Sequence, residues 1–269
     1  MKLQNAGDMP CGPAVSANTA APSIAGTPVE RAAYLSGLGD LAWERGDLQD
    51  ALRHFEAAVR LDADQPAAAT GRARVLAALG RTSQALAAYR AVLAGRPTAR
   101  AALELGELYE ALGMTGQAEA QYEQLRTLVR QQVAGGVDEE LLIGRFEADH
   151  GDPAEAVERL EEEWQRQPGV EVADALGWAL HRSGNDGEAL AYASIATDKE
   201  KGGGVRSALY AFHRGVIERE LDLYAPARRH LQEALRINPY FSPLGVPEAR
   251  AALASLGDVP DEPPPAETP

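Results

Sequence analysis

The sequence predicts an all-α protein built as a solenoid of six helix-turn-helix repeats with a capping helix at its C-terminal end. Two columns of residues carry this prediction. The first column holds alanine throughout: Ala51, Ala85, Ala118, Ala156, Ala189 and Ala227. The second holds a small residue in each repeat: Gly39, Ala73, Gly106, Gly144, Gly177 and Gly215. Both columns advance by the same steps of 34, 33, 38, 33 and 38 residues, and this agreement indicates an internal repeat.

Each repeat is expected to form two short helices that fold back on each other. In residues 34–64, Ala51, Phe55 and Ala58 are spaced by 4 and 3 residues, which places them on one helix face. Gly46 ends the preceding helical pattern, and the aspartate after it is expected to N-cap the next helix, because its carboxylate can accept from free first-turn N–H groups. Phe55 is expected to fill the space between this helix pair and the next.

Two further columns follow the same spacing. The turn column reads Gly46, Gly80, Gly113, Gly151, Gly184 and Asp222. The aromatic column reads Phe55, Tyr89, Tyr122, Leu160, Ala193 and Leu231. The four columns together resemble the tetratricopeptide repeat. This resemblance implies a right-handed α-solenoid whose first helices line a concave groove, and residues 146–250 resemble bacterial proteins of this type.

The predicted domain organisation is a disordered leader at 1–29, a solenoid at 30–257 and a disordered, acidic, proline-rich tail at 258–269. The predicted repeats are 30–65, 66–98, 99–136, 137–169, 170–204 and 205–241. A last helix is expected at 247–256, where it would cover the apolar end of the solenoid. The alternative for this last helix is a partner-binding role.

The two 38-residue steps are the main irregularity of the array. The second helix of repeat three is expected to run on to about Val133, before Gly135–Gly136, and that of repeat five to fray after Asp198, before Gly202–Gly204. Changes of superhelical angle at these joints would divide the array into blocks of three, two and one repeats. The alternative is two passive surface insertions. Glu163, which replaces a small or apolar residue in its column, is expected to weaken packing after repeat four.

Composition and motifs bound the function. The formal net charge of −14 disfavours nucleic acid as a partner, and no apolar stretch is long enough to predict a membrane span. The single cysteine, Cys11, excludes a disulfide framework. Because catalytic, phosphate-binding and metal-ligand motifs are absent, no catalytic residue, metal or cofactor is predicted. The compartment stays open between the cytoplasm and export with removal of a signal.

The resemblance to tetratricopeptide repeats places particular first-helix residues in the groove. Those predicted to contact a partner are Asp40, Trp43, Arg74, Glu107, Arg145, Asp149, Asp174, Trp178, His181, Arg182, Phe212 and Arg219. The two tryptophans could anchor a ligand or could pack between neighbouring first helices. The arginines could clamp a carboxylate, or they could pair with acidic residues of the groove and leave nothing for a ligand.

The sequence therefore predicts a non-enzymatic module or scaffold that binds a peptide or partner protein of unknown identity in its concave groove. The alternative is a structural subunit that self-associates or stacks through its convex face or its ends in an envelope complex.

Overall fold

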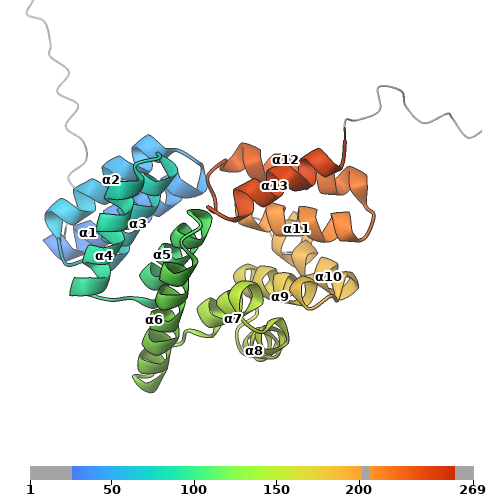
Figure 1. The fold of residues 1–269 in the computed structure, drawn as a ribbon, viewed down its shortest axis with the longest axis horizontal. Helices are drawn as coiled ribbons and strands as arrows, with labels where there is room; N and C mark the ends of the chain where they lie inside the picture. The colour runs from blue at the N-terminus through green and yellow to red at the C-terminus, as the bar shows by residue number, and fades with distance from the viewer. Residues whose placement is uncertain (1–25, 202–205, 258–269) are drawn as a thin grey trace, which may run out of the picture.

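The computed structural model describes residues 26–201 and 206–257, and all regular secondary structure in these residues is helical (Figure 1). Most of the predicted leader and the whole predicted tail lie outside the described residues. The first helix begins at Pro28, within the predicted leader, because Thr27 caps it. The Thr27 Oγ1 accepts from Glu30 N at 3.3 Å, and Glu30 Oε2 accepts from Thr27 N at 2.8 Å. This capping box satisfies two otherwise free N–H groups.

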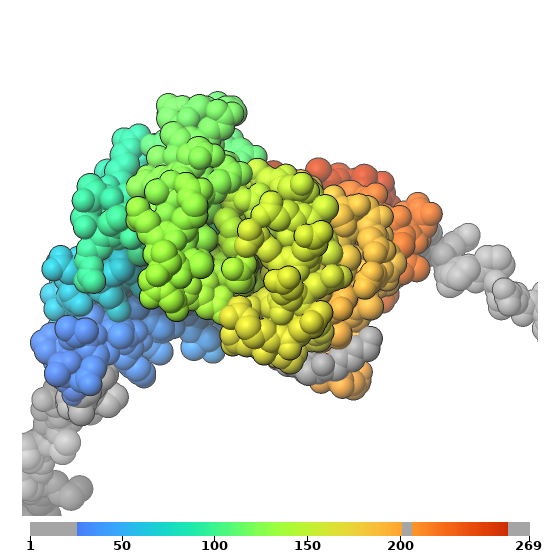
Figure 2. All heavy atoms as spheres, turned by 90° about the horizontal axis from the view of Figure 1, so that it is seen from below, coloured from blue at the N-terminus to red at the C-terminus, as the bar shows by residue number. Residues whose placement is uncertain are grey.

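Six helix pairs follow one another, as the sequence predicts. They are α1 (Pro28–Glu44) with α2 (Leu48–Leu61), α3 (Pro66–Ala78) with α4 (Thr82–Gly95), α5 (Ala99–Ala111) with α6 (Thr115–Ala134), α7 (Glu140–His150) with α8 (Pro153–Arg166), α9 (Val170–Arg182) with α10 (Asp186–Thr197), and α11 (Ala208–Glu220) with α12 (Tyr224–Ile237). A short 3₁₀ helix, η1 (Lys199–Lys201), follows α10. The last helix, α13 (Gly245–Ser255), packs against α11 and α12. Figure 2 shows the repeats as adjacent bands in chain order.

A large side chain packed against a glycine holds the first repeats together. Phe55 is 0% exposed, and a Cβ added to Gly39 would lie 2.6 Å from its ring. A Cβ on Gly71, in the next repeat, would lie 2.4 Å from the same ring. The ring therefore fills space that exists only because neither glycine has a side chain, and the predicted wedge role of Phe55 is confirmed.

The hydrophobic core has two main clusters, which meet inside α7. Phe146 belongs to the cluster that begins in α1, whereas Ala148 belongs to the cluster that continues into α13. α6 runs to Ala134, about as predicted. Among the described residues, α6 packs less against α7 than any other second helix packs against the first helix of the next repeat. Beyond α10 the second cluster continues into α11, and Arg214 of α11 donates to Thr197 Oγ1 of α10 at 2.7 Å. The predicted changes of superhelical angle at the two joints stay a prediction.

Glu163 does not weaken the packing after repeat four, so that expectation is wrong. Its side chain is 7% exposed and is paired with Arg166 of the same helix. α8 approaches α9 as closely as α2 approaches α3. A buried carboxylate is tolerated here because a guanidinium compensates its charge.

The array closes on itself, and the sequence analysis did not predict this. Asn238, after α12, is 1% exposed, and its Nδ2 donates to Trp43 O of α1 at 2.8 Å across 195 residues of chain. Its Oδ1 accepts from Tyr240 N at 2.9 Å. Gly46 lies so close that an added Cβ would be 3.2 Å from Asn238 Cα. The α1–α2 turn therefore meets the α12–α13 loop and completes a ring (Figure 1).

None of the helices in the described ranges is long and apolar enough to span a bilayer.

Candidate functional site

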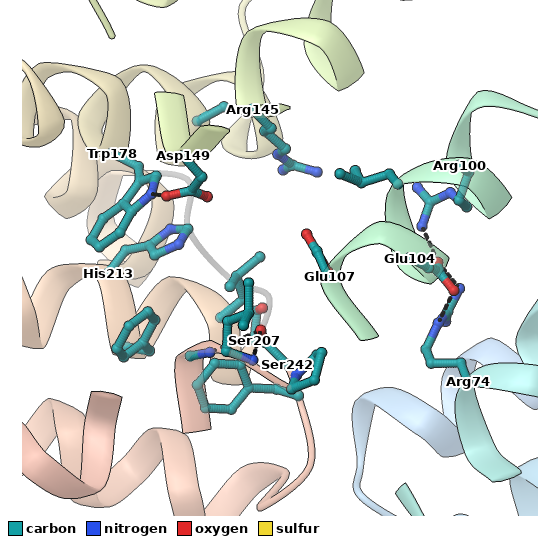
Figure 3. A pocket seen from close by; sticks show the side chains of 18 of the residues that line it. Arg74, Arg100, Glu104, Glu107, Arg145, Asp149, Trp178, Ser207, His213 and Ser242 are labelled. Atoms are coloured by element: carbon teal, nitrogen blue, oxygen red, sulfur yellow. Dashed lines mark hydrogen bonds and ion pairs between the residues drawn. The ribbon is translucent and has the colours of Figure 1, made fainter. Parts of the chain in front are cut away.

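Ring closure leaves a cavity of about 2000 Å³, called the central cavity below. It is lined by residues of α1, α3, α5, α7, α9 and α11 and by the loop that leads from α12 into α13. Figure 3 shows part of its wall. The first helices thus form the inner surface, as the resemblance implied. The α12–α13 loop is a part of the lining that the sequence analysis missed.

Most of the predicted groove residues lie at the central cavity. They are Trp43, Arg74, Glu107, Arg145, Asp149, Trp178, Arg182 and Phe212. Their convergence follows from one structural cause: each occupies a first helix, and ring closure turns all six first helices inward.

Four predicted residues do not line the cavity. Asp40 lies beside it and is paired with Arg74 at 3.5 Å. Asp174 is 1% exposed and lies behind the wall. His181 Nδ1 is 2.5 Å from Asp186 Oδ1, an interaction within its own repeat. Arg219, in the last turn of α11, pairs with the neighbouring Glu220 at 2.5 Å, away from the cavity. The position of a residue within its repeat did not place these four, because each side chain is paired with another residue, in its own repeat or in the next one.

Arg74 is engaged within the protein. Its Nη2 donates to Glu104 Oε1 at 2.7 Å and its Nε donates to Glu104 Oε2 at 3.1 Å (Figure 3). The Tyr89 hydroxyl donates to Glu104 Oε2 at 3.0 Å, and burial raises the pKa of this phenol well above its usual value. The guanidinium also lies 5.4 Å from the ring of Trp43. Arg74 is therefore paired within the protein, which is the second of the two alternatives given for the arginines. Its partner, Glu104, is not among the predicted groove residues.

Trp178 is built into the wall of the cavity. It is 4% exposed, and its Nε1 donates to Asp149 Oδ1 at 2.8 Å. Its ring stacks on His213, with centroids 4.2 Å apart and planes 15° apart. His213 Nδ1 lies 3.0 Å from Asp174 Oδ1 on the far side. This chain of contacts joins α7, α9 and α11. Trp178 therefore packs between first helices, which is the second of the two alternatives given for the tryptophans. Its indole N–H holds Asp149 at the cavity surface.

Arg182 lies close to the same Asp149 oxygen. Its Nε is 3.7 Å from Asp149 Oδ1, and it donates to Ala148 O at 3.3 Å. Phe212, the remaining aromatic residue predicted for the groove, is 3% exposed and packs 5.7 Å from the Trp178 ring. Trp178 and Phe212 therefore both belong to the cavity wall, and both are almost fully buried in it.

Glu107 differs from the neighbouring acidic residues Glu104, Glu110 and Asp149, which all have side-chain partners. It points into the central cavity (Figure 3), and its carboxyl group has no hydrogen bond or ion pair with any described residue. Burial raises its pKa to about 8, and the negative charges of Asp149, Glu104 and Glu110 add to this shift, against a smaller opposing effect of Arg74. A proton is therefore held on Glu107 near neutral pH, where an ordinary glutamate is ionised.

Glu107→Gln is expected to change how stability depends on pH. In the unfolded chain Glu107 loses its proton near its ordinary pKa of 4.5, whereas in the folded protein it keeps the proton up to about pH 8. Stability of the native protein therefore falls as pH rises between these values. Glutamine removes this loss, so the variant should match the native protein at pH 5 and exceed it by about 1–2 kcal/mol at pH 9, after allowance for partial solvent access.

Urea unfolding at pH 5, 7 and 9 checks this result. The matched control is Glu119→Gln, since Glu119 is an exposed residue of α6 that does not line the cavity. Parallel pH profiles for all three proteins would contradict a raised pKa at Glu107.

Comparison with known proteins supports the fold. Residues 42–102 match a family model described as tetratricopeptide repeat. The chain is similar in structure to a tetratricopeptide repeat protein from Parabacteroides merdae, with a TM-score of 0.53 and 18% identity over 84% of each chain. It is also similar to the APC/C hetero-tetramer Cut9-Hcn1, with a TM-score of 0.49, 18% identity, and coverage of 85% of this chain and 43% of that one. A search of the curated proteins finds no match.

Proposed function

We propose that this chain, which has the fold of a tetratricopeptide-repeat protein, acts without catalysis as an interaction module that holds a segment of a partner protein in its central cavity. The observation that carries this proposal is a cavity lined by the first helices of all six repeats. Helical solenoids present concave surfaces of this kind to their partners. A volume of about 2000 Å³ exceeds the roughly 300–1,000 Å³ typical of small-molecule sites, which favours a length of polypeptide as the occupant.

The walls of the cavity are held in place before any partner arrives. Hydrogen bonds to Glu104 and Asp149 fix Arg74 and Trp178. Side chains that are already ordered lose little conformational entropy on binding. Such a wall favours recognition of an extended segment, because most of the conformational entropy lost on binding is then lost by the segment and little by the wall.

The polar groups of the cavity favour binding over catalysis. Two serines lie there, and both accept hydrogen bonds near helix starts: Ser207 Oγ from Tyr210 N at 3.5 Å, and Ser242 Oγ from Gly245 N at 3.0 Å. Across residues 26–201 and 206–257, neither serine is hydrogen-bonded to His213. The pair of nucleophile and base that acyl-transfer enzymes use is therefore not assembled from these groups.

The alternative role in self-assembly has less support. Stacking of solenoids end to end requires free ends, whereas here the α1–α2 turn is packed against the α12–α13 loop through Asn238. The large exposed apolar side chains are distributed over several helices, for example Tyr34 on α1, Val133 on α6 and Tyr224 on α12. Exposed apolar residues spread over several helices in this way are normal on a protein surface.

Filling the cavity should abolish capture of the partner. Ala78 lines the cavity at the end of α3, whereas Ala87 is exposed on α4 and does not line it. In affinity capture from the native source, the unmodified protein and Ala87→Trp are expected to retain the same partner, and Ala78→Trp is expected to lose it. Circular dichroism checks that both variants fold. Equal capture by Ala78→Trp would show that the partner binds elsewhere, and a concentration-dependent dimer in sedimentation would favour self-assembly.

A further inference from the structure

Three acidic residues that lie near Glu107 in the central cavity are matched by partners. Glu104 has two hydrogen bonds from Arg74, at 2.7 and 3.1 Å. Asp149 accepts from Trp178 at 2.8 Å and lies 3.7 Å from Arg182. Both carboxylates are thus already used in building the wall, and a ligand would have to displace these contacts to reach them.

Glu110 is matched as well. Its Oε2 accepts from the Tyr122 hydroxyl at 2.7 Å and lies 3.3 Å from His150 Nδ1. Glu107, one helical turn earlier on α5, has no such partner among the described residues, although it lies at the same cavity. An ionised carboxylate in this position would face three other acids, and no cation among the described residues is paired with it.

A donor without a full set of acceptors also points into the cavity. Arg145 of α7 donates from Nη2 to Glu171 O at 3.2 Å, but it forms no ion pair with a described carboxylate. Its Nε is buried without a hydrogen-bond partner. Figure 3 shows Arg145 and Glu107 both directed into the open space. The Nε is enclosed by the protein, so an acceptor supplied by a ligand would meet the outer end of the guanidinium, which faces the cavity.

The far side of the cavity is apolar. Phe212 and Phe241 pack with ring centroids 5.3 Å apart, and Leu209 and Val246 lie in the same lining. The cavity therefore combines an uncompensated carboxyl group, a spare N–H donor and an apolar wall. An extended polypeptide offers complements to all three: a cationic side chain, a backbone carbonyl and an apolar side chain.

We propose that the partner segment is basic: it places a lysine or arginine side chain against Glu107, a backbone carbonyl against Arg145, and an apolar side chain on the wall formed by Phe212 and Phe241. This inference rests on the proposed function, since it names the chemistry of the segment held in the central cavity. The net charge of −14 also favours the approach of a basic segment over an acidic one.

Binding should depend on pH because Glu107 must lose its proton to meet the cation. The charged and titratable groups around it are Arg74 on α3, Tyr89 on α4, Glu104 and Glu110 on α5, Tyr122 on α6 and Asp149 on α7. Burial together with the three acids keeps the pKa of Glu107 at about 8. A cation would lower this pKa, so binding releases a proton, and affinity is expected to rise by about fivefold between pH 7 and pH 8 and to level off above about pH 9.

A displayed library of random dodecapeptides tests the proposal. Selection at pH 8.5 is carried out on the unmodified chain, on Glu107→Gln and on Glu119→Gln. Peptides selected on the unmodified chain and on Glu119→Gln are expected to be enriched in lysine and arginine, and those selected on Glu107→Gln are not. The best basic peptide, synthesised with a fluorophore, should bind Glu107→Gln about tenfold or more weakly than the unmodified chain.

The outcomes separate this inference from the function on which it rests. Selected peptides that compete with one another and are blocked by Ala78→Trp, but carry no basic enrichment, would overturn the basic segment and leave cavity binding standing. Equal affinity of the basic peptide for Glu107→Gln, or affinity that does not vary between pH 7 and pH 8, would also overturn it. Failure of every library peptide to bind the folded, unmodified chain would contradict both proposals.

Discussion

Phe55→Ala is expected to lower the free energy of unfolding by about 3–5 kcal/mol, the range for truncation of a fully buried aromatic side chain. The ring is 0% exposed and lies between Gly39 of its own repeat and Gly71 of the next. Because the two glycines have no side chains to move inward, the cavity left by the truncation cannot be refilled locally. Urea unfolding followed by circular dichroism measures the change.

The control for this prediction removes an aromatic ring from the surface. Tyr34 lies on α1, in the same repeat, and is 53% exposed, so Tyr34→Ala should change stability by no more than about 0.5 kcal/mol. A loss below about 1 kcal/mol for Phe55→Ala would contradict the wedge role, since truncations in a tightly packed core cost more than that.

Asn238→Ala is expected to weaken ring closure and to lower stability by about 2–3 kcal/mol, because it removes one buried and one partly buried hydrogen bond and leaves a small void. The Asn238 side chain donates to Trp43 O and accepts from Tyr240 N. Loss of the acceptor leaves Tyr240 N–H without its partner. The radius of gyration in small-angle X-ray scattering should increase, since the first and last repeats are no longer held together.

A pair of glycine variants separates closure from turn geometry. Gly46 and Gly80 occupy equivalent turns, and both have φ of +72°. Alanine is strained at either position, but only at Gly46 would its Cβ also lie 3.2 Å from Asn238 Cα and Ile237 O. Gly46→Ala should therefore cost about 1 kcal/mol more than Gly80→Ala and should expand the molecule. Equal effects of the two variants on stability and on size would mean that the contact does not hold the ring.

Closure matters for the proposed function because it forms the cavity. The α12–α13 loop lines the cavity and is held by Asn238, so an open ring would remove one wall while leaving each repeat folded. Solenoid stability comes mainly from interfaces between neighbouring repeats. Variants at Asn238 can thus lose binding of the partner segment before they lose helical structure.

The sequence by itself determined the elements and their order. The Ala51 and Gly39 columns identify each helix pair, because close helix packing needs small residues at a fixed spacing on one face. The wedge at Phe55, the run-on of α6 and a helix at the C-terminal end all follow from local pattern. These features depend on residues close together in the chain, and helical periodicity records such relations directly.

The tertiary structure decided the ring and the partners within it. Asn238 meets Trp43 across 195 residues, and no repeat column relates the two, since closure depends on small rotations summed over all the repeats. The same holds for the charged groups. The sequence placed Arg74 and Glu107 on the inner face, but only the folded ring shows that Arg74 is taken by Glu104 whereas Glu107 is left without a partner. Which side chains pair depends on the distances between residues of different repeats, and the sequence of a single repeat does not contain these distances.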